Sequence, residues 1–326
     1  MTDDAARCQR TLAEGFRSIW EILPYTPSAI SFAFPGPPTT RTASSETCPT
    51  SRVSGEAWLR PYLEHVFGIP VFIKQRRQLV RLRRSLTGIL PEVNDRLKAC
   101  GSQRRYHNLI GVTLGTGFGA GVVIRNELLT GDNSTGGDVW CQRNHKYPEY
   151  IVEESVSIRA VRHVYARESG SAENLSPKDI FQIAEGTRNG NPEAARAAFA
   201  ELGQMAAEAL ASALTLIDGL VVIGGACRVP INTSAPPCLK VCAAHWACAT
   251  AAVSPRLQME IYDLEDEKEF EAFATTPKRL IPVLDTDRTI PYDAFKRTGI
   301  ALTRQGTNRS IALGAYTFAL RQLDRP

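Results

Sequence analysis

The sequence lacks any long apolar run. None of its 326 residues belongs to a stretch approaching the roughly eighteen consecutive apolar residues that cross a bilayer. The opening residues MTDDAARCQR are acidic and polar, whereas a secretory signal peptide is basic and then apolar. These absences predict a cytoplasmic protein with no membrane partner.

Paired cysteine motifs are also absent. The chain has eight cysteines but no C-x-x-C pair, and a chain of this size does not need disulfides to fold. We therefore expect free thiols. Cys141 and His145, in WCQRNHKYP, are only two potential ligands, too few for a structural zinc site, so the sequence predicts no metal site.

The net charge is small, at +4, and does not by itself indicate a polyanionic partner. One segment is nevertheless strongly basic: six cations and no acid lie between Lys74 and Arg84, directly after the apolar run IPVFI. Three explanations compete: a patch that binds nucleic acid, a solvent-exposed helix face, and a segment whose sequence natural selection did not shape. A nucleic-acid partner is disfavoured because aromatic residues do not interleave with the cations.

Apolar periodicity indicates an α/β fold, because strand patterns alternate with helical ones. A polar turn at Arg125 and Asn126 divides AGVVIRNELLTG into a hairpin. Helical spacing occurs at 5–23, 150–166, 192–216 and 310–323, and strand patterns occur within 28–37, 69–73, 108–114 and 219–225. Two intervals, 38–59 and 226–254, show no stable period, which is unusual for loops of that length in a compact domain.

The segment LGTGFGAGVV, Leu114–Val123, carries the sharpest chemical signal. Its four alternating glycines allow close approach of the backbone to an anion, and their N–H groups, with the Thr116 hydroxyl, are suitable donors to phosphate oxygens. Taken alone, the pattern fits a phosphate site and also a plain glycine-rich turn.

The neighbouring segments give this pattern a context. LLTGDNSTGGDVW follows it, and LTLIDGLVVIGGA lies further along. In this order and spacing the motifs resemble the ROK family of sugar kinases and sugar-responsive repressors. The resemblance implies two actin-like (ribonuclease H-like) lobes with an interlobe cleft. It places residues 1–108, completed by a C-terminal helix at 309–323, in an incomplete first lobe, and residues 109–308 in the nucleotide and sugar lobe.

The resemblance also implies functions for individual residues. Gly115, Thr116 and Gly117 would bind nucleotide phosphates, and Gly224 and Gly225 would approach the adenosine. The sugar hydroxyls would contact Asn133 and Asp138, although the family has glutamate where this chain has Asp138. The implied cofactors are ATP and Mg²⁺, the implied small-molecule partner is a sugar, and the implied assembly is a homodimer.

Two expected features are missing from the sequence. The family's catalytic aspartate, in an N-D pair after a strand such as IPVFI, corresponds to Arg76, whose guanidinium cannot accept a proton. The opening strand with D-x-G-G-T is also absent, so we expect an incomplete first lobe and no intact catalytic residue.

Compensating frameshifts would explain the basic segment. Codons allowed for Lys74–Ser85 can be chosen so that, read one base later, they encode N-N-D-G-N-W-F-A-Y-G-E, which resembles the family's catalytic segment. Similar readings exist for residues 38–51 and for the interval after Ala226.

The sequence leaves three functions open: a sugar kinase by descent with impaired catalysis, a noncatalytic sugar-binding or regulatory protein, and a transcriptional repressor. The repressor is disfavoured because the 23 residues before Pro24 hold one helix, whereas a helix-turn-helix needs more.

Overall fold

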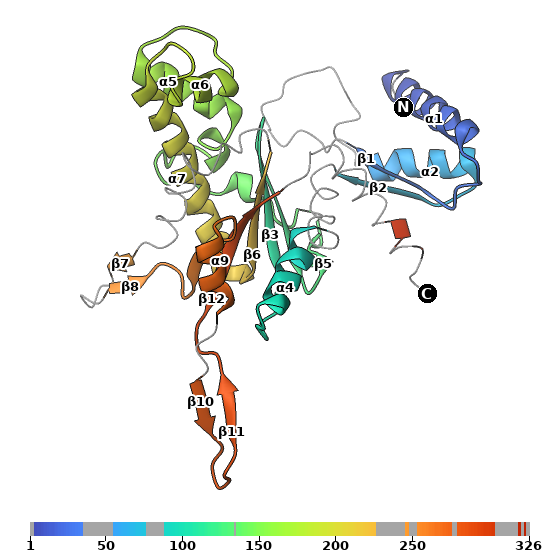
Figure 1. Ribbon diagram of the computed structural model, residues 1–326. Helices are drawn as coiled ribbons and strands as arrows, with labels where there is room; N and C mark the ends of the chain where they lie inside the picture. Colours follow the sequence, from blue (N-terminus) through green and yellow to red (C-terminus); the bar gives the residue numbers. More distant parts are fainter. Residues whose placement is uncertain are drawn as a thin grey trace. The chain divides into compact units, whose positions relative to one another are not determined.

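The chain forms two compact units (Figure 1). Unit 1 comprises Met1–Arg83 and Gln305–Pro326, and unit 2 comprises Arg84–Arg304. The computed structural model describes residues 3–34, 55–75, 88–133, 135–225, 245–247, 253–275, 279–303, 319–320 and 323. The domain boundary expected at residue 108 stays a prediction, as does the helix at 309–323, which lies almost wholly outside the described residues.

Unit 1 contains a strand–helix–strand unit preceded by a helix. Strands β1 and β2 pair in parallel, from Ile30 with Val71 to Phe34 with Gln75, and parallel neighbours require a crossover, which contains α2. The bounds are α1 Asp3–Ile22, β1 Ile30–Phe34, α2 Gly55–Phe67 and β2 Val71–Gln75. The core of this unit consists of Ala13, Ile30, Leu59, Leu63, Val71 and Ile73.

Unit 2 is built on a mixed six-stranded sheet in the order β5-β4-β3-β6-β12-β9. Strands β3, β6, β12 and β9 run parallel, while β4 and β5 are antiparallel to their neighbours. The bounds are β3 Leu109–Leu114, β4 Phe118–Ile124, β5 Glu127–Leu128, β6 Leu220–Gly224, β9 Glu260–Asp263 and β12 Arg297–Leu302.

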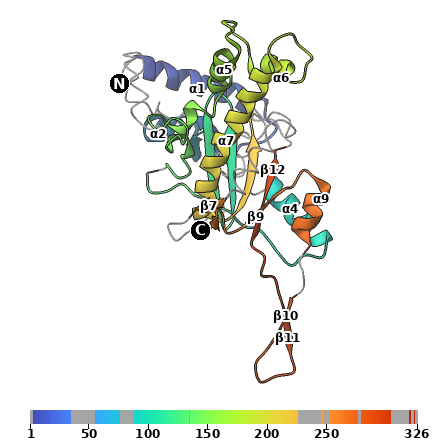
Figure 2. The same cartoon turned by 90° about the vertical axis from the view of Figure 1, so that its left-hand side faces the viewer.

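Helices cover both faces of this sheet because its strands are apolar on both sides. On β3, Ile110 and Val112 pack with helices α5, α6 and α7, whereas Leu109 packs with α4 and α9. Figure 2 shows α7 lying along one face. The bounds are α4 Ile89–Ala99, α5 Ile158–Ser169, α6 Pro177–Ala184, α7 Pro192–Ile217 and α9 Glu267–Ala274. The predicted α/β class is confirmed.

Shorter elements complete unit 2. Two hairpins, β7–β8 and β10–β11, are antiparallel. Their strands are β7 His245–Ala247, β8 Val253–Pro255, β10 Arg279–Pro282 and β11 Thr289–Tyr292, and the short 3₁₀ helices are η2 Val139–Cys141 and η3 Val152–Glu154. Within the described part of the chain, no helix combines the length and the apolar character needed to cross a bilayer.

The predicted hairpin turn is confirmed. Arg125 and Asn126 both have positive φ, 50° and 65°, and they connect β4 to β5 in a two-residue turn. Positive φ at both central positions is the geometry that matches the twist of the flanking strands. Asn108 fixes this turn from outside, because its side-chain oxygen accepts a hydrogen bond from the Arg125 N–H at 2.9 Å.

Two sequence predictions need correction. The helix expected over 150–166 is divided: η3 ends at Glu154, and α5 starts after Ser157, whose hydroxyl accepts a hydrogen bond from the Ala160 N–H. A serine cap of this kind begins a helix. The lack of a stable period in 38–59 and 226–254 does not exclude regular structure, because these intervals contain the start of α2, strand β7 and the first two residues of β8; the rest of them lies outside the described residues.

Helix α7 carries a buried carboxylate, Glu201, with an exposed fraction of 7%. Its Oε2 accepts hydrogen bonds from Lys146 Nζ at 2.6 Å and from Arg167 Nη2 at 3.0 Å. Burial alone would raise the pKa of Glu201, but the hydrogen bonds from both cations outweigh it, so the pKa lies below its ordinary value of 4.5. The ion pairs therefore stabilise the fold while Glu201 is ionised.

We expect Glu201→Gln to remove an acid-sensitive part of the stability. A lowered folded-state pKa gives stability that is complete above the unfolded pKa and is lost as the pH falls through the folded pKa. The variant should therefore be less stable by about 1 kcal/mol at neutral pH, since both partner cations are half exposed, and the difference should vanish in acid. Urea unfolding across this pH range measures it. Glu168→Gln, which alters an exposed partner of Arg167, is the control. If the free energy of unfolding depends on pH in the same way for Glu201→Gln and the wild type, the expectation is wrong.

Candidate functional site

The two glycine segments singled out in the sequence lie side by side at one edge of the unit 2 sheet. Strands β3 and β6 pair in parallel up to Thr113 with Gly224, so Gly115 and Gly225 both follow the carboxyl ends of neighbouring strands. Ligands of open α/β sheets bind at this edge. The edge of β3 and β6 is therefore the candidate site.

Gly225 is packed directly against the end of β3. Its φ is 115°, and a Cβ atom there would lie 2.2 Å from the Leu114 carbonyl oxygen and 2.7 Å from its nitrogen. No side chain fits between backbones at that spacing. This close approach keeps the end of β6 next to the glycine turn.

The glycine turn between β3 and β4 is a tight reversal. The Gly115 N–H donates to the Gly117 carbonyl at 3.2 Å, and the Gly115 carbonyl accepts from the Ile158 N–H, at the start of α5, at 2.8 Å. The Thr116 side chain is exposed. Among the described residues, the N–H groups of Thr116 and Gly117 have no hydrogen-bond partner, so two backbone donors and one hydroxyl remain for a ligand.

Glu153 also belongs to this turn, and sequence reasoning missed it. Its Oε2 accepts a hydrogen bond from the Phe118 N–H at 2.8 Å, and the same atom would lie 2.4 Å from a Cβ on Gly117. A side chain at position 117 would therefore displace the Glu153 carboxylate from its present place. Two adjacent glutamates, Glu153 and Glu154, stand in the sequence, and nothing in their order indicates which one faces the turn.

Asn133 and Asp138 lie in the loop that follows β5. Asn133 is exposed and Asp138 is half buried at the start of η2. The loop lies on β4, because a Cβ on Gly137 would be 3.2 Å from Gly121 Cα. Gly121 thus serves a second purpose beyond the glycine pattern of the turn: it lets the loop that carries both predicted sugar ligands pack on the strand.

Cys141 and His145 have other contacts. Cys141 Sγ donates to the Asp138 carbonyl at 3.0 Å, and burial, followed by the charge of Asp138, raises the pKa of the Cys141 thiol. His145 Nδ1 lies 3.9 Å from Glu208 Oε2. Over the described ranges, no group of three or more His, Cys, Asp or Glu side chains is arranged to hold a metal ion.

Arg76 lies outside the described residues. The backbone is described up to Gln75, the last residue of β2, which pairs with Phe34 of β1. Position 76 thus directly follows the carboxyl end of a parallel strand in unit 1. The basic segment that continues to Arg84 also lies outside the described residues.

Taken together, the sheet and the two adjoining glycine segments define an α/β protein whose candidate site lies at the carboxyl ends of two neighbouring parallel strands. Residues 97–229 match the ROK family. The structure is similar to the crystal structure of a glucokinase from Parabacteroides distasonis, with a TM-score of 0.86 and 53% identity over 97% of this chain and 87% of that one. The chain belongs to the ROK family.

More distant structures share the fold. A ROK hexokinase from Thermus thermophilus has a TM-score of 0.61 at 17% identity, covering 98% of this chain and 88% of that one. A ROK family transcriptional regulator, a homologue of the Escherichia coli MLC protein, has a TM-score of 0.58 at 20% identity, covering 96% and 67%. No curated protein sequence matches the chain. The predicted actin-like fold is confirmed at the level of the family, whereas an incomplete first lobe stays a prediction.

Proposed function

We propose that the chain is a cytoplasmic protein that descends from an ATP-dependent sugar kinase and retains its binding residues. The ancestral reaction transfers a phosphoryl group to a hydroxyl of a hexose or N-acetylhexosamine, and Arg76 impairs that transfer. One observation carries the proposal: the glycine turn after β3 and the Gly224–Gly225 end of β6 lie against each other. The similarity to a glucokinase at 53% identity supports the choice of substrate class.

The residues at this edge fit a nucleotide. The N–H groups of Thr116 and Gly117 and the Thr116 hydroxyl would bind phosphate oxygens, and the backbone at Gly224 and Gly225 would contact the adenosine. ATP would supply the phosphoryl group. Magnesium, which usually binds through phosphates and one or two carboxylates, would offset the repulsion between those phosphates and Glu153.

The acceptor side lacks its base. Asn133 and Asp138 offer an amide and a carboxylate to sugar hydroxyls, and neither function requires proton transfer. Transfer to a hydroxyl is assisted by a carboxylate that orients it and accepts its proton. Arg76 stays protonated and cannot do so, hence the expected impairment.

A noncatalytic sugar-binding or regulatory function is the second candidate. It is favoured by the combination of retained sugar ligands at Asn133 and Asp138 with arginine at the position of the base. The two candidates differ in turnover: a residual kinase releases ADP in the presence of its sugar, whereas a sensor binds the sugar and releases none. An ADP-coupled assay against a panel of hexoses and N-acetylhexosamines, with calorimetry on the same panel, separates them.

Gly115→Ala should weaken ATP binding without weakening the fold. A Cβ on Gly115 meets no atom within 4 Å, so the methyl group would extend into the open space beside the turn. If phosphates bind there, we expect a loss of about tenfold or more in affinity, which corresponds to about 1.4 kcal/mol. Calorimetry with ATP and Mg²⁺ measures this, and thermal unfolding provides the control. Unchanged affinity in a folded variant would contradict the proposed phosphate site.

A further inference from the structure

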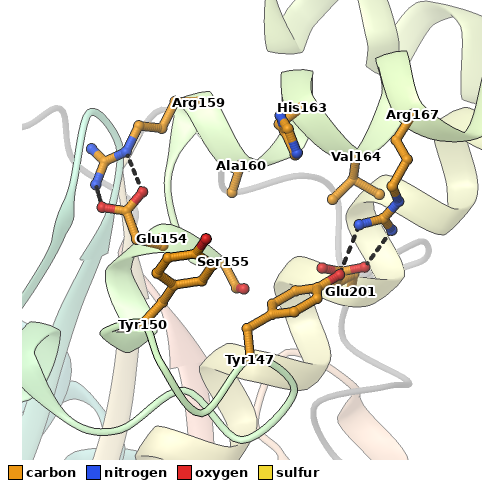
Figure 3. A pocket seen from close by; sticks show the side chains of 10 residues that line it. All are labelled: Tyr147, Tyr150, Glu154, Ser155, Arg159, Ala160, His163, Val164, Arg167 and Glu201. Atoms are coloured by element: carbon orange, nitrogen blue, oxygen red, sulfur yellow. Dashed lines mark hydrogen bonds and ion pairs between the residues drawn. The ribbon is translucent and has the colours of Figure 1, made fainter.

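Unit 2 contains a pocket that the proposed function does not use. It has a volume of about 480 Å³, within the range of small-molecule sites. Figure 3 shows that it lies between helix α5, the segment 147–155 and helix α7. None of the glycines or predicted sugar ligands lines it.

Helix α5 contributes a row of three basic side chains. Arg159, His163 and Arg167 are four residues apart, so they share one face of the helix and span about 12 Å. In Figure 3 the His163 ring points into the pocket between the two arginines. Among the described residues, His163 has no hydrogen bond or ion pair.

Each arginine is held by a carboxylate that also lines the pocket. Arg159 Nη2 and Nε donate to Glu154 at 2.6 and 3.1 Å, and Arg167 Nη2 donates to Glu201 at 3.0 Å. Two guanidinium groups therefore face two carboxylates. Within the lining these charges of opposite sign are equal in number, so the lining arginines and glutamates favour neither an anionic nor a cationic ligand over a neutral one.

The wall opposite α5 is aromatic. The rings of Tyr147 and Tyr150 lie 6.5 Å apart between centroids, and Figure 3 shows both across the pocket from α5. Ala160 and Val164, both buried, supply an apolar base. Such rings offer large flat apolar surfaces with a polar end.

The remaining polar groups both donate and accept hydrogen bonds. The two ring nitrogens of an imidazole such as that of His163 offer hydrogen-bonding positions to a ligand. The buried Ser155 hydroxyl accepts from Asn144 Nδ2 at 2.8 Å and keeps its own hydrogen to donate. Hydroxyl groups of a ligand have the same dual capacity, so a polyhydroxylated ring would pair with these groups.

We propose that this pocket binds a neutral carbohydrate, with a sugar ring packed on Tyr147 or Tyr150 and its hydroxyls hydrogen-bonded to His163, Ser155 and the arginine–glutamate pairs. The site is separate from the sugar ligands Asn133 and Asp138, and the inference does not depend on the proposed kinase ancestry. A mono- or disaccharide is the size of ligand that the volume admits.

Isothermal titration of the full chain with D-glucose and with maltose tests the inference. Tyr150→Ala and His163→Ala should each weaken binding by about tenfold or more. Both side chains are exposed, so unchanged thermal unfolding is expected in both variants. Tyr25→Ala, an exposed tyrosine of unit 1, should change nothing and serves as the matched control.

Two further measurements test whether the pocket prefers neutral sugars and whether the sugar binds in the pocket or at the loop after β5. Glucose 6-phosphate and glucosamine should bind no more tightly than glucose, because the lining arginines and glutamates are equal in number. Asp138→Asn should leave this binding intact while it removes sugar binding at the loop after β5. The inference is overturned if neither neutral sugar binds, if both pocket variants bind as the wild type does, or if either charged sugar binds more tightly.

Discussion

Replacing Gly225 by alanine should lower the free energy of unfolding by about 4 kcal/mol, a large part of the 5 to 15 kcal/mol typical of a folded domain. The added Cβ would lie 2.2 Å from the Leu114 carbonyl oxygen, a backbone atom that cannot move without disturbing β3. The φ of 115° adds strain. Because the change separates β6 from the glycine turn, ATP affinity should fall with stability. Chemical unfolding measures the first effect and calorimetry the second.

Gly170→Ala is the matched control for this experiment. Gly170 ends α5 with a φ of 67°, and a Cβ there meets nothing within 4 Å. The Gly170→Ala variant therefore loses about 1 to 2 kcal/mol of unfolding free energy for a left-handed backbone, but its Cβ collides with no other atom. If Gly225→Ala and Gly170→Ala lower the free energy of unfolding equally, the predicted collision with Leu114 does not occur.

The purified chain should not phosphorylate sugars at an enzymatic rate, and replacing Lys74–Arg84 by N-N-D-G-N-W-F-A-Y-G-E should raise turnover above that of the unaltered chain. The replacement puts aspartate in place of Arg76. A positioned general base contributes roughly a hundredfold to ten-thousandfold, so we expect a gain of that size in an ADP-coupled assay with glucose and N-acetylmannosamine.

The control for the segment replacement is the same eleven-residue exchange with asparagine instead of aspartate at position 76. It restores the shape of the segment but supplies no proton acceptor, so its turnover should stay near background. Arg76→Asp alone leaves the surrounding basic segment in place and should gain less. Turnover by the unaltered chain at about 1 to 1,000 s⁻¹, the usual enzymatic range, would contradict the electrostatic argument.

The frameshift explanation makes a separate prediction at the level of the gene. If the segments at 38–51, 74–85 and after Ala226 are read out of frame, genomic sequencing should show insertions or deletions at their borders. An uninterrupted reading of the same codons in related strains would contradict it.

Elements with strong local signals could be predicted from the sequence. The strand at 108–114 and the long alanine-rich helix at 192–216 correspond to β3 and α7, because each pattern of apolar residues is buried on the faces that its period indicates. The turn at Arg125 and Asn126 was predictable for the same reason, since its residue types and its flanking strands agree.

Other features depend on contacts between distant segments and have no local signal. The approach of Gly225 to Leu114 joins positions more than a hundred residues apart, and the hydrogen bond from the Phe118 N–H to Glu153 joins a turn to a 3₁₀ helix. The balance of charges around His163 likewise requires α5, α7 and the segment 147–155 together. Sequence reasoning could indicate the glycine segments but not the carboxylate beside them.

The two cores of unit 2 draw all their buried members from residues 89–301, and the core of unit 1 draws its members from residues 13–73. Among the described residues, each of these cores is therefore formed within a single unit. If unit 1 lost its catalytic residues during evolution, unit 2 could still fold around its own cores. Selection on solubility or on ligand binding could then maintain unit 2. Loss of activity would in that case not lead to misfolding and degradation of the protein.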